Sequence, residues 1–240
     1  MPRIPLPTAT QKGEAKAHPF PIQIGYQTLE FLHGAIFYAT VTDLATGAYI
    51  KHHQGRPKLE EHMESLGLVG DAHAKGWEIL QKYESVFKSV PFQSVLISLC
   101  SHWDWYVRRL SGFIRAGRTH LGEPPLAKDQ EQKLKRADRL PLNEQLQILS
   151  IASGVDFDLT PGDIDLLYEM SLVRNLGLHN RWEVDDTYLN QSQSTSYSVG
   201  DIRDLSSSEL DQWHKLLIKL INRSSINVAI KYVGVPASEI

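Results

Sequence analysis

The sequence contains little cysteine: Cys100 is the only one among 240 residues. A single cysteine excludes an internal disulfide framework and a cluster of thiolate metal ligands. Because Cys100 lies among Leu96, Ile97 and Leu99, we expect its thiol to be buried and unreactive. The chain also contains no run of about eighteen apolar residues, so no transmembrane helix is predicted. The N-terminus lacks a basic region followed by an apolar core, so we expect no secretory signal and a cytoplasmic location.

Motifs of several common enzyme classes are missing as well. The sequence GxSxG, which carries the nucleophile of many serine hydrolases, does not occur. Neither GxGxxG nor GxxxxGK[ST] occurs, which removes the simplest nucleotide-binding folds. The formal net charge is −3, so the chain as a whole gives no sign of nucleic-acid binding. A nucleic-acid partner would therefore have to be held by a local patch.

The densest group of potential metal ligands contains three histidines and three glutamates: His52, His53, His62, Glu60, Glu61 and Glu64. Their spacing matches neither HExxH nor an HxH pair with a carboxylate, and most of them lie in a predicted loop. We therefore interpret them as a solvated group, and we expect neither a metal ion nor another cofactor.

Apolar residues recur at steps of three and four along most of the chain, which predicts an all-α (mainly α) fold with at most a small β-hairpin. Residues 1–21 hold five of the twelve prolines and are predicted to form an irregular arm. A first helix is expected from about residue 27, ended by residues 45–48 and followed by a polar loop. Pro91 is predicted to open the longest helix. Helices are predicted at about residues 27–44, 58–65, 71–87, 91–116, 127–139, 142–151, 160–180 and 206–228, with a brief extended segment at 197–204.

The most distinctive stretch is SLVRNLGLHN, residues 171–180, at the end of one predicted helix. Residues 160–163, with the sequence TPGD, form a capping box with proline at the first helical position. Asn175 and His179 continue the apolar stripe of this helix, and Arg174 lies one step round from it. A buried guanidinium is costly without a partner, so we expect a local salt bridge or a functional site. The stripe expected to be buried consists of Ile164, Leu167, Tyr168, Leu172 and Leu176.

Two interpretations of Arg174, Asn175 and His179 remain open from the residues alone. In the first, Arg174 pairs with Asp104 or Glu169, and His179 caps the helix, where its charge is favourable. In the second, the three residues cleave RNA. Histidine can take the proton of a 2′-hydroxyl or protonate the leaving oxygen, and arginine can bind the phosphate and stabilise its growing charge. Asparagine would orient either group, and no metal ion is required.

A second stretch, from Arg115 to Arg139, contains seven Lys or Arg residues against four acidic ones. It is interpreted first as a solvated helix and loop. The functional alternative is a patch that contacts phosphates, which requires that it lie near residues 171–180.

The sequence Arg174-Asn175-x-x-x-His179 resembles the RNxxxH form of the Rx4-6H motif of the HEPN superfamily. Asn180 and the segment VDDTYL at residues 184–189 are also typical of this superfamily. Residues 94–110 resemble the long helix that precedes the motif helix. The resemblance covers about residues 75–232. Here the long helix reads His-Trp-Asp-Trp-Tyr at residues 102–106, which is bulkier than the leucine-rich pattern of the family, and Gly177 permits the motif helix to end early.

The resemblance implies a HEPN-like helical bundle that forms a homodimer, with two copies of the motif at one cleft. It implies metal-independent endoribonuclease activity that leaves a 2′,3′-cyclic phosphate and a 5′-hydroxyl, in a toxin, a phage-defence effector or an RNA-processing protein. An antitoxin or another protein is then expected as a partner in addition to RNA, and no association with a membrane is expected. Carried over by position, Arg174 and His179 would be catalytic, Asn175 would support them, and Asp104 is the candidate for the acidic residue of the long helix.

The residues themselves predict an irregular arm at 1–21 and an N-terminal helical extension at 22–74, and the resemblance implies a HEPN-like domain at 75–232. Two alternatives to the ribonuclease remain. One is a HEPN-like module that binds RNA or a protein without cleaving it. The other is a purely structural helical protein in which Arg174 is held in an ion pair with Asp104.

Overall fold

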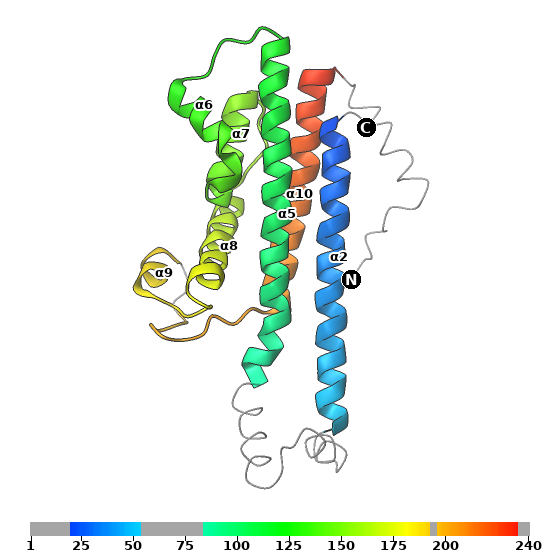
Figure 1. The fold of residues 1–240 in the computed structure, drawn as a ribbon, viewed down its shortest axis with the longest axis vertical. Helices are drawn as coiled ribbons and strands as arrows, with labels where there is room; N and C mark the ends of the chain where they lie inside the picture. Colours follow the sequence, from blue (N-terminus) through cyan, green and yellow to red (C-terminus); the bar gives the residue numbers. More distant parts are fainter. Residues whose placement is uncertain (1–19, 54–83, 193–195, 235–240) are drawn as a thin grey trace, which may run out of the picture.

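The computed structural model describes residues 20–53, 84–192 and 196–234 (Figure 1). In these ranges the chain forms seven α-helices, one short 3-10 helix and no strand, which confirms the predicted all-α class. No helix in the described ranges is long and apolar enough to cross a membrane. The elements are α2 Phe20–His53, α5 Glu84–His120, α6 Lys128–Lys135, η1 Ala137–Arg139, α7 Leu142–Ser153, α8 Pro161–His179, α9 Asp186–Gln191 and α10 Ser207–Val233.

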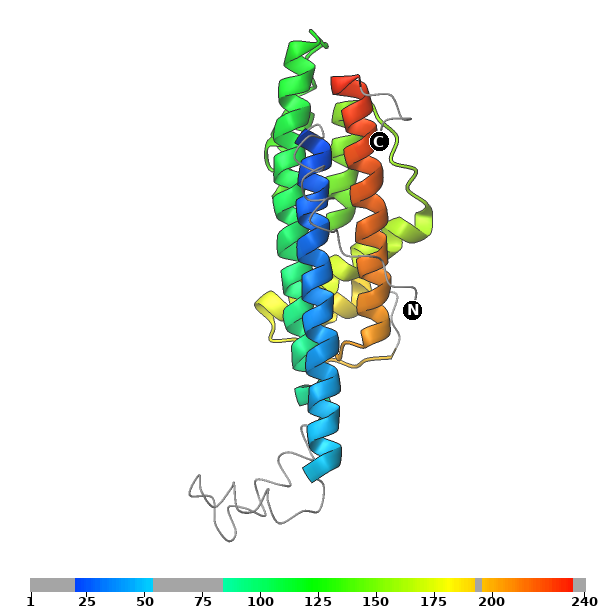
Figure 2. The same ribbon diagram turned by 90° about the vertical axis from the view of Figure 1, so that its right-hand side faces the viewer.

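Three long helices, α2, α5 and α10, lie side by side, and α7 and α8 pack on the other side of α5 from α2 (Figures 1 and 2). Their apolar faces meet in one hydrophobic core, to which α2 contributes Ile24, Leu29 and Leu32. The largest fully buried side chains include Trp103 and Tyr106 of α5. The described part of the predicted N-terminal extension therefore shares a core with the helices that carry the motif.

Both predicted ends of the first helix and the predicted start of the longest helix are wrong, and the last two residues of the predicted irregular arm, Phe20 and Pro21, belong to α2. Helix α2 begins at Phe20 and continues through residues 45–48 to His53. Gly47 costs a helix only about 1 kcal/mol relative to alanine, which is too little to end a helix that has alanines around it. Helix α5 begins at Glu84, so Pro91 lies inside it and does not open it. A proline removes one backbone hydrogen bond, and here buried residues that follow it, such as Phe92, keep the helix in place.

The predicted helix starts at residues 160 and 206 are confirmed. Thr160 Oγ1 accepts a hydrogen bond from the Asp163 amide at 3.1 Å, and Asp163 Oδ2 accepts one from the Thr160 amide at 3.0 Å. Ser206 and Glu209 form the same reciprocal pair at the start of α10. These bonds satisfy amides that have no partner inside the helix. In the segment predicted as extended, Ile202 forms a single antiparallel bridge with Glu183.

The remaining predicted helices differ little from the structure in their described parts. The charged segment forms α6 and η1, and α7 follows it from Leu142 to Ser153. Helix α5 reaches His120, four residues beyond the predicted end at residue 116, and its last turn carries Arg118 and His120, which suit the negative end of the helix dipole. The predicted helix at 58–65 and most of the one at 71–87 lie outside the described residues.

Candidate functional site

The motif residues lie on two different faces of α8. At 3.6 residues per turn, side chains five positions apart point about 140° from each other, so Arg174 and His179 diverge. Leu167, Met170 and Val173 are fully buried and mark the inward face, to which Arg174 belongs. Asn175 and His179 are exposed. The prediction that they continue the buried stripe is wrong, because the centre of the buried face lies at Met170 and Arg174.

Arg174 forms an ion pair with Asp104 of α5. Its Nη2 donates to Asp104 Oδ2 at 2.7 Å, while Glu169 binds other partners. The Arg174 side chain is 25% exposed and that of Asp104 13%, so the pair sits at the edge of the core. The pairing of Arg174 with Asp104, one of the two options predicted from sequence, is therefore present.

A buried amide, Gln145 of α7, holds Asp104 from the other side. Gln145 Nε2 donates to Asp104 Oδ1 and to the Leu140 carbonyl, both at 2.9 Å, and its Oε1 accepts from the Trp103 indole at 2.7 Å. Burial raises the pKa of the Asp104 carboxyl, and the bonds from Gln145 and Arg174 counteract that rise. The carboxylate thus has donors on both of its oxygens. Gln145 was not predicted, because no local pattern links it to a residue 41 positions away.

Cys100 lies one turn before Asp104 on α5. It is fully buried, and burial raises the pKa of its thiol to about 12. A thiol with such a pKa stays protonated at neutral pH and reacts slowly. The predicted buried, unreactive cysteine is confirmed.

Asn175 and His179 lie one turn apart and line the same hollow on the outer face of α8. The hollow has a volume of about 240 Å³ and extends to α9. Among the described residues, neither side chain takes part in a hydrogen bond or ion pair. An exposed imidazole with no partner can exchange protons with a bound substrate. The lining residues are Leu172, Asn175, Leu176, His179, Asn180, Asp185, Thr187, Tyr188 and Gln191.

The turn after the motif is tightly built. Helix α8 continues through Gly177 to His179, so the early end that Gly177 permits does not occur. Gly177 is needed for another reason: a Cβ there would clash with the ring of Trp182. Arg181 and Trp182 both have positive φ, of 53° and 69°, a conformation that costs about 1–3 kcal/mol per residue. The Trp182 amide donates to the Leu176 carbonyl at 3.1 Å, which helps to hold the turn.

Asn180 and Asp185 connect this turn to α9 beneath the hollow. The Asn180 side-chain amide donates to the Glu183 carbonyl at 2.7 Å and to Asp185 Oδ2 at 3.4 Å. Asp185 Oδ1 accepts from the Tyr188 amide at 2.7 Å and caps α9. The residues that follow the motif therefore fix the wall of the hollow opposite His179.

A buried arginine that was not predicted, Arg203, supports this wall. Its Nε donates to the Tyr188 hydroxyl at 2.9 Å, and its guanidinium binds Glu209 at 2.5 Å and the Asp204 carbonyl. The Tyr188 hydroxyl in turn donates to Glu169 at 2.6 Å. Arg203 thus joins α8, α9 and α10, and it holds the ring of Tyr188 at the hollow. Glu169 also lies 3.9 Å from the Arg203 guanidinium, so the partners extend from Glu169 to Glu209, and periodicity gives no sign of them.

The other two candidate regions do not join this site. Two arginines of the basic stretch face acids, Arg115 with Glu131 and Arg118 with Glu123, and α6 lies at the opposite end of α8 from α9 (Figure 1). The side chains of the histidine–glutamate group at residues 52–64 lie outside the described part. Among the side chains described, no three His, Cys, Asp or Glu residues meet in a way that could hold a metal ion.

The chain matches no protein-family model, and comparisons with curated proteins and with solved structures give no significant match. The described residues of α8 present two features on different faces of this helix. One is an exposed asparagine and histidine over a hollow, and the other is an arginine tied to an aspartate at the edge of the core.

Proposed function

We propose that this protein is a metal-independent endoribonuclease of HEPN type that cleaves RNA by transesterification. The observation that carries the proposal is the exposure of His179, which shares a hollow with Asn175 and has no partner among the described residues. A catalytic imidazole must reach the atoms between which it moves a proton. A histidine that only capped the helix would be expected to hold a carbonyl oxygen.

In the proposed reaction the 2′-oxygen of a ribose attacks the adjacent phosphorus, and the bond from phosphorus to the 5′-oxygen breaks. His179 takes the proton of the 2′-hydroxyl or gives one to the departing 5′-oxygen, and a second group does the other. The products are a 2′,3′-cyclic phosphate and a 5′-hydroxyl. Asn175 lies one turn from His179, where its amide can hold either the imidazole or a phosphate oxygen.

Arg174 and Asp104 have separate roles in this proposal. Arg174 supplies positive charge to the phosphate, for which its partial exposure leaves room. Asp104 is a positioning residue, because its carboxylate holds the guanidinium at 2.7 Å. Since Arg174 and His179 of one chain diverge by about 140°, the two would meet a single phosphate most readily in a cleft shared by two copies. Leu178, which is 50% exposed between them, would lie in that contact.

A non-catalytic HEPN-like module that binds RNA or a protein is the second candidate. The observation that favours it is the ion pair itself, because an arginine held by Asp104 and faced away from His179 is not arranged for chemistry in one chain. Such a module would bind RNA through the same hollow and release it uncut. If the ribonuclease proposal holds, cleavage of cellular or phage RNA would make the protein a toxin or a defence effector.

The nature of the products tests the proposal. An RNA oligonucleotide and the same oligonucleotide with 2′-deoxyribose at the cleaved position are incubated with the protein, and the products are identified by mass spectrometry. We expect a cyclic phosphate from the first and no cleavage of the second. Cleavage of both, or a product with a 5′-phosphate, would exclude attack by the 2′-oxygen. Binding of the intact RNA without cleavage would favour the second candidate.

A further inference from the structure

Helix α2 is apolar on its outer side as well as on the side that faces the core. Its outward row consists of five large side chains that are between 46% and 70% exposed. In Figure 2 α2 lies nearest the viewer, and no described helix covers its outer side. A helix that is apolar all round is normally buried on all sides in the complete assembly. The outward row is Phe31, Phe37, Tyr38, Val41 and Leu44.

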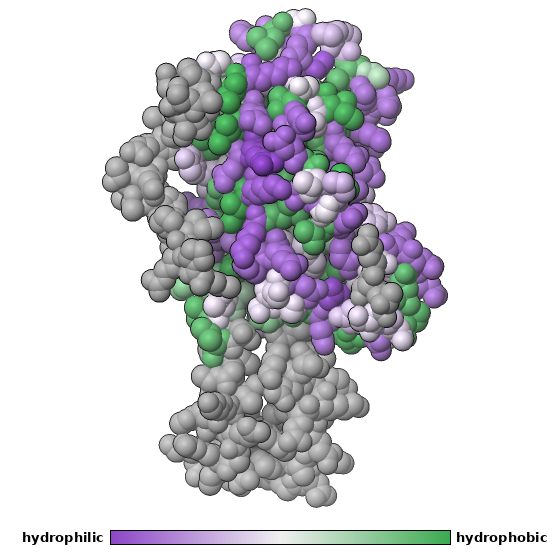
Figure 3. All heavy atoms as spheres, turned by 180° about the vertical axis from the view of Figure 1, so that it is seen from behind, coloured by the Kyte–Doolittle hydropathy of each residue, from purple (hydrophilic) through white to green (hydrophobic). Residues whose placement is uncertain are grey.

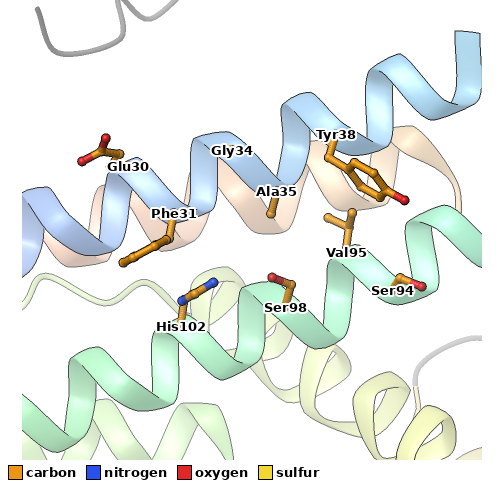
Figure 4. Close-up of a pocket in the computed structure, with 9 residues that line it drawn as sticks. All are labelled: Glu30, Phe31, Gly34, Ala35, Tyr38, Ser94, Val95, Ser98 and His102. Carbon is orange, nitrogen blue, oxygen red and sulfur yellow. The ribbon is translucent and has the colours of Figure 1, made fainter.

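A groove runs beside this row, between α2 and α5. Its volume is about 410 Å³. Phe31 lies over the ring of His102 at one end, with ring centres 4.6 Å apart and planes nearly parallel, and Tyr38 stands toward the other end (Figure 4). Between them the groove is lined by small side chains, among them Ala35 and Ser98 (Figure 4). Gly34 adds no side chain, and a Cβ there would meet no atom within 4 Å.

We propose that the outward row and the groove together form an interface with a second copy of this chain, in which α2 packs on α2 across a two-fold axis. A two-fold contact requires a surface that fits itself, with projections and recesses both present. Here the projections, Phe37 and Tyr38, follow the recess at Gly34 by one helical turn. Two helices that cross in opposite directions would each place these rings over the glycine of the other.

The size of the apolar surface agrees with this occupant. Five side chains of these types at the observed exposure offer about 500 Å² of apolar area. A standard interface buries about 800 Å² on each partner, so the row would form its centre. Such centres are depleted in charge, and among the described residues that line the groove Glu30 is the only charged one.

An RNA strand fits this surface poorly. The described lining of the groove contains no Lys or Arg, and nucleic-acid affinity depends on neutralising phosphates. The face seen from behind is different in character: hydrophilic side chains cover much of its described part, with smaller apolar patches between them (Figure 3). The α2 interface also goes beyond the proposed function, because α8 and α9 lie on the other side of α5 (Figure 1).

Sedimentation velocity of the full chain at about 50 µM tests the interface. Gly34→Arg places a charged side chain at the groove, where a Cβ would meet no atom within 4 Å. Gly112→Arg is the matched control, because Gly112 is an exposed glycine of α5 with equally open space around it. We expect the particle mass of the wild type to be halved by Gly34→Arg and left unchanged by Gly112→Arg. Circular dichroism confirms that both variants are folded.

A second substitution, Phe37→Glu, should also halve the mass, because Phe37 is the most exposed member of the row. The proposal is overturned if the wild type sediments with the mass of one chain, in which case a different protein covers the row. It is also overturned if Gly34→Arg and Phe37→Glu sediment like the wild type. A contact made only through α8 would give that second result, so the two interfaces are distinguishable.

Discussion

Two histidines meet inside the bundle, His33 on α2 and His214 on α10. Their ring centres are 5.3 Å apart and the rings are nearly perpendicular. In the described structure, both ring nitrogens of His33 and Nε2 of His214 are buried without a hydrogen-bond partner. Burial lowers the pKa of both side chains, and the pKa of His214 falls to about 4, with the proximity of His33 as the next cause.

These pKa values predict that acid weakens the fold. In the unfolded chain a histidine binds a proton below about pH 6.5, whereas folded His214 stays neutral down to about pH 4. Between these values the unfolded state holds more protons, so the free energy of unfolding falls as the pH falls. A shift of this size corresponds to about 3 kcal/mol, since each pKa unit is worth about 1.4 kcal/mol. That is a large part of the 5–15 kcal/mol typical of a domain. His33 adds to the loss in the same direction.

Urea unfolding at several pH values between 7.5 and 4 measures this dependence. We expect His214→Leu to lose about 3 kcal/mol less than the wild type over this interval, because a leucine takes up no proton. His120→Leu is the control for replacing an exposed histidine by leucine, since His120 lies at the surface in the last turn of α5. If wild type and His214→Leu lose stability in parallel, the histidine pair does not cause the acid sensitivity and the reasoning is refuted.

Two further substitutions test the support of the hollow. Gly177→Ala should destabilise the fold by about 1–3 kcal/mol in thermal unfolding, because its Cβ would clash with Trp182. The control Gly112→Ala should be neutral or slightly stabilising. Equal melting temperatures of the two variants would contradict the packing of Trp182 on α8. Arg203→Met should lower the free energy of unfolding in urea by about 3–5 kcal/mol, since Glu209 loses its buried partner. A decrease of less than 1 kcal/mol would show that the cluster around Arg203 is dispensable.

The parts of the fold that could be predicted from sequence are those with local causes. The capping boxes at Thr160 and Ser206 involve residues three positions apart, and both helices begin where the pattern places them. The boundaries near Gly47 and Pro91 could not be predicted in this way. A single glycine costs a helix only about 1 kcal/mol, which does not set a helix end. At Pro91 the burial of the residues that follow, such as Phe92, keeps α5 continuous, and that burial depends on distant helices.

The candidate site divides in the same manner. The pairing of Arg174 with Asp104 was predictable, because a guanidinium on an inward face needs an acid. The orientation of His179 could not be predicted. Apolar residues at steps of three and four are compatible with either of two neighbouring faces of the helix being buried, and only the position of α5 decides which face it is. Gln145 and Arg203 bind partners far along the chain, so no periodicity reveals them.

Cleavage of RNA in the presence of EDTA, by the wild type and by His179→Ala purified in the same way, tests the central claim most directly. His120→Ala serves as the control for loss of an exposed histidine, and unfolding curves confirm that all three proteins are equally stable. We expect cleavage by the wild type and by His120→Ala that persists in EDTA and is lost in His179→Ala. Equal cleavage by all three proteins, or none by the wild type on any RNA, would contradict this claim.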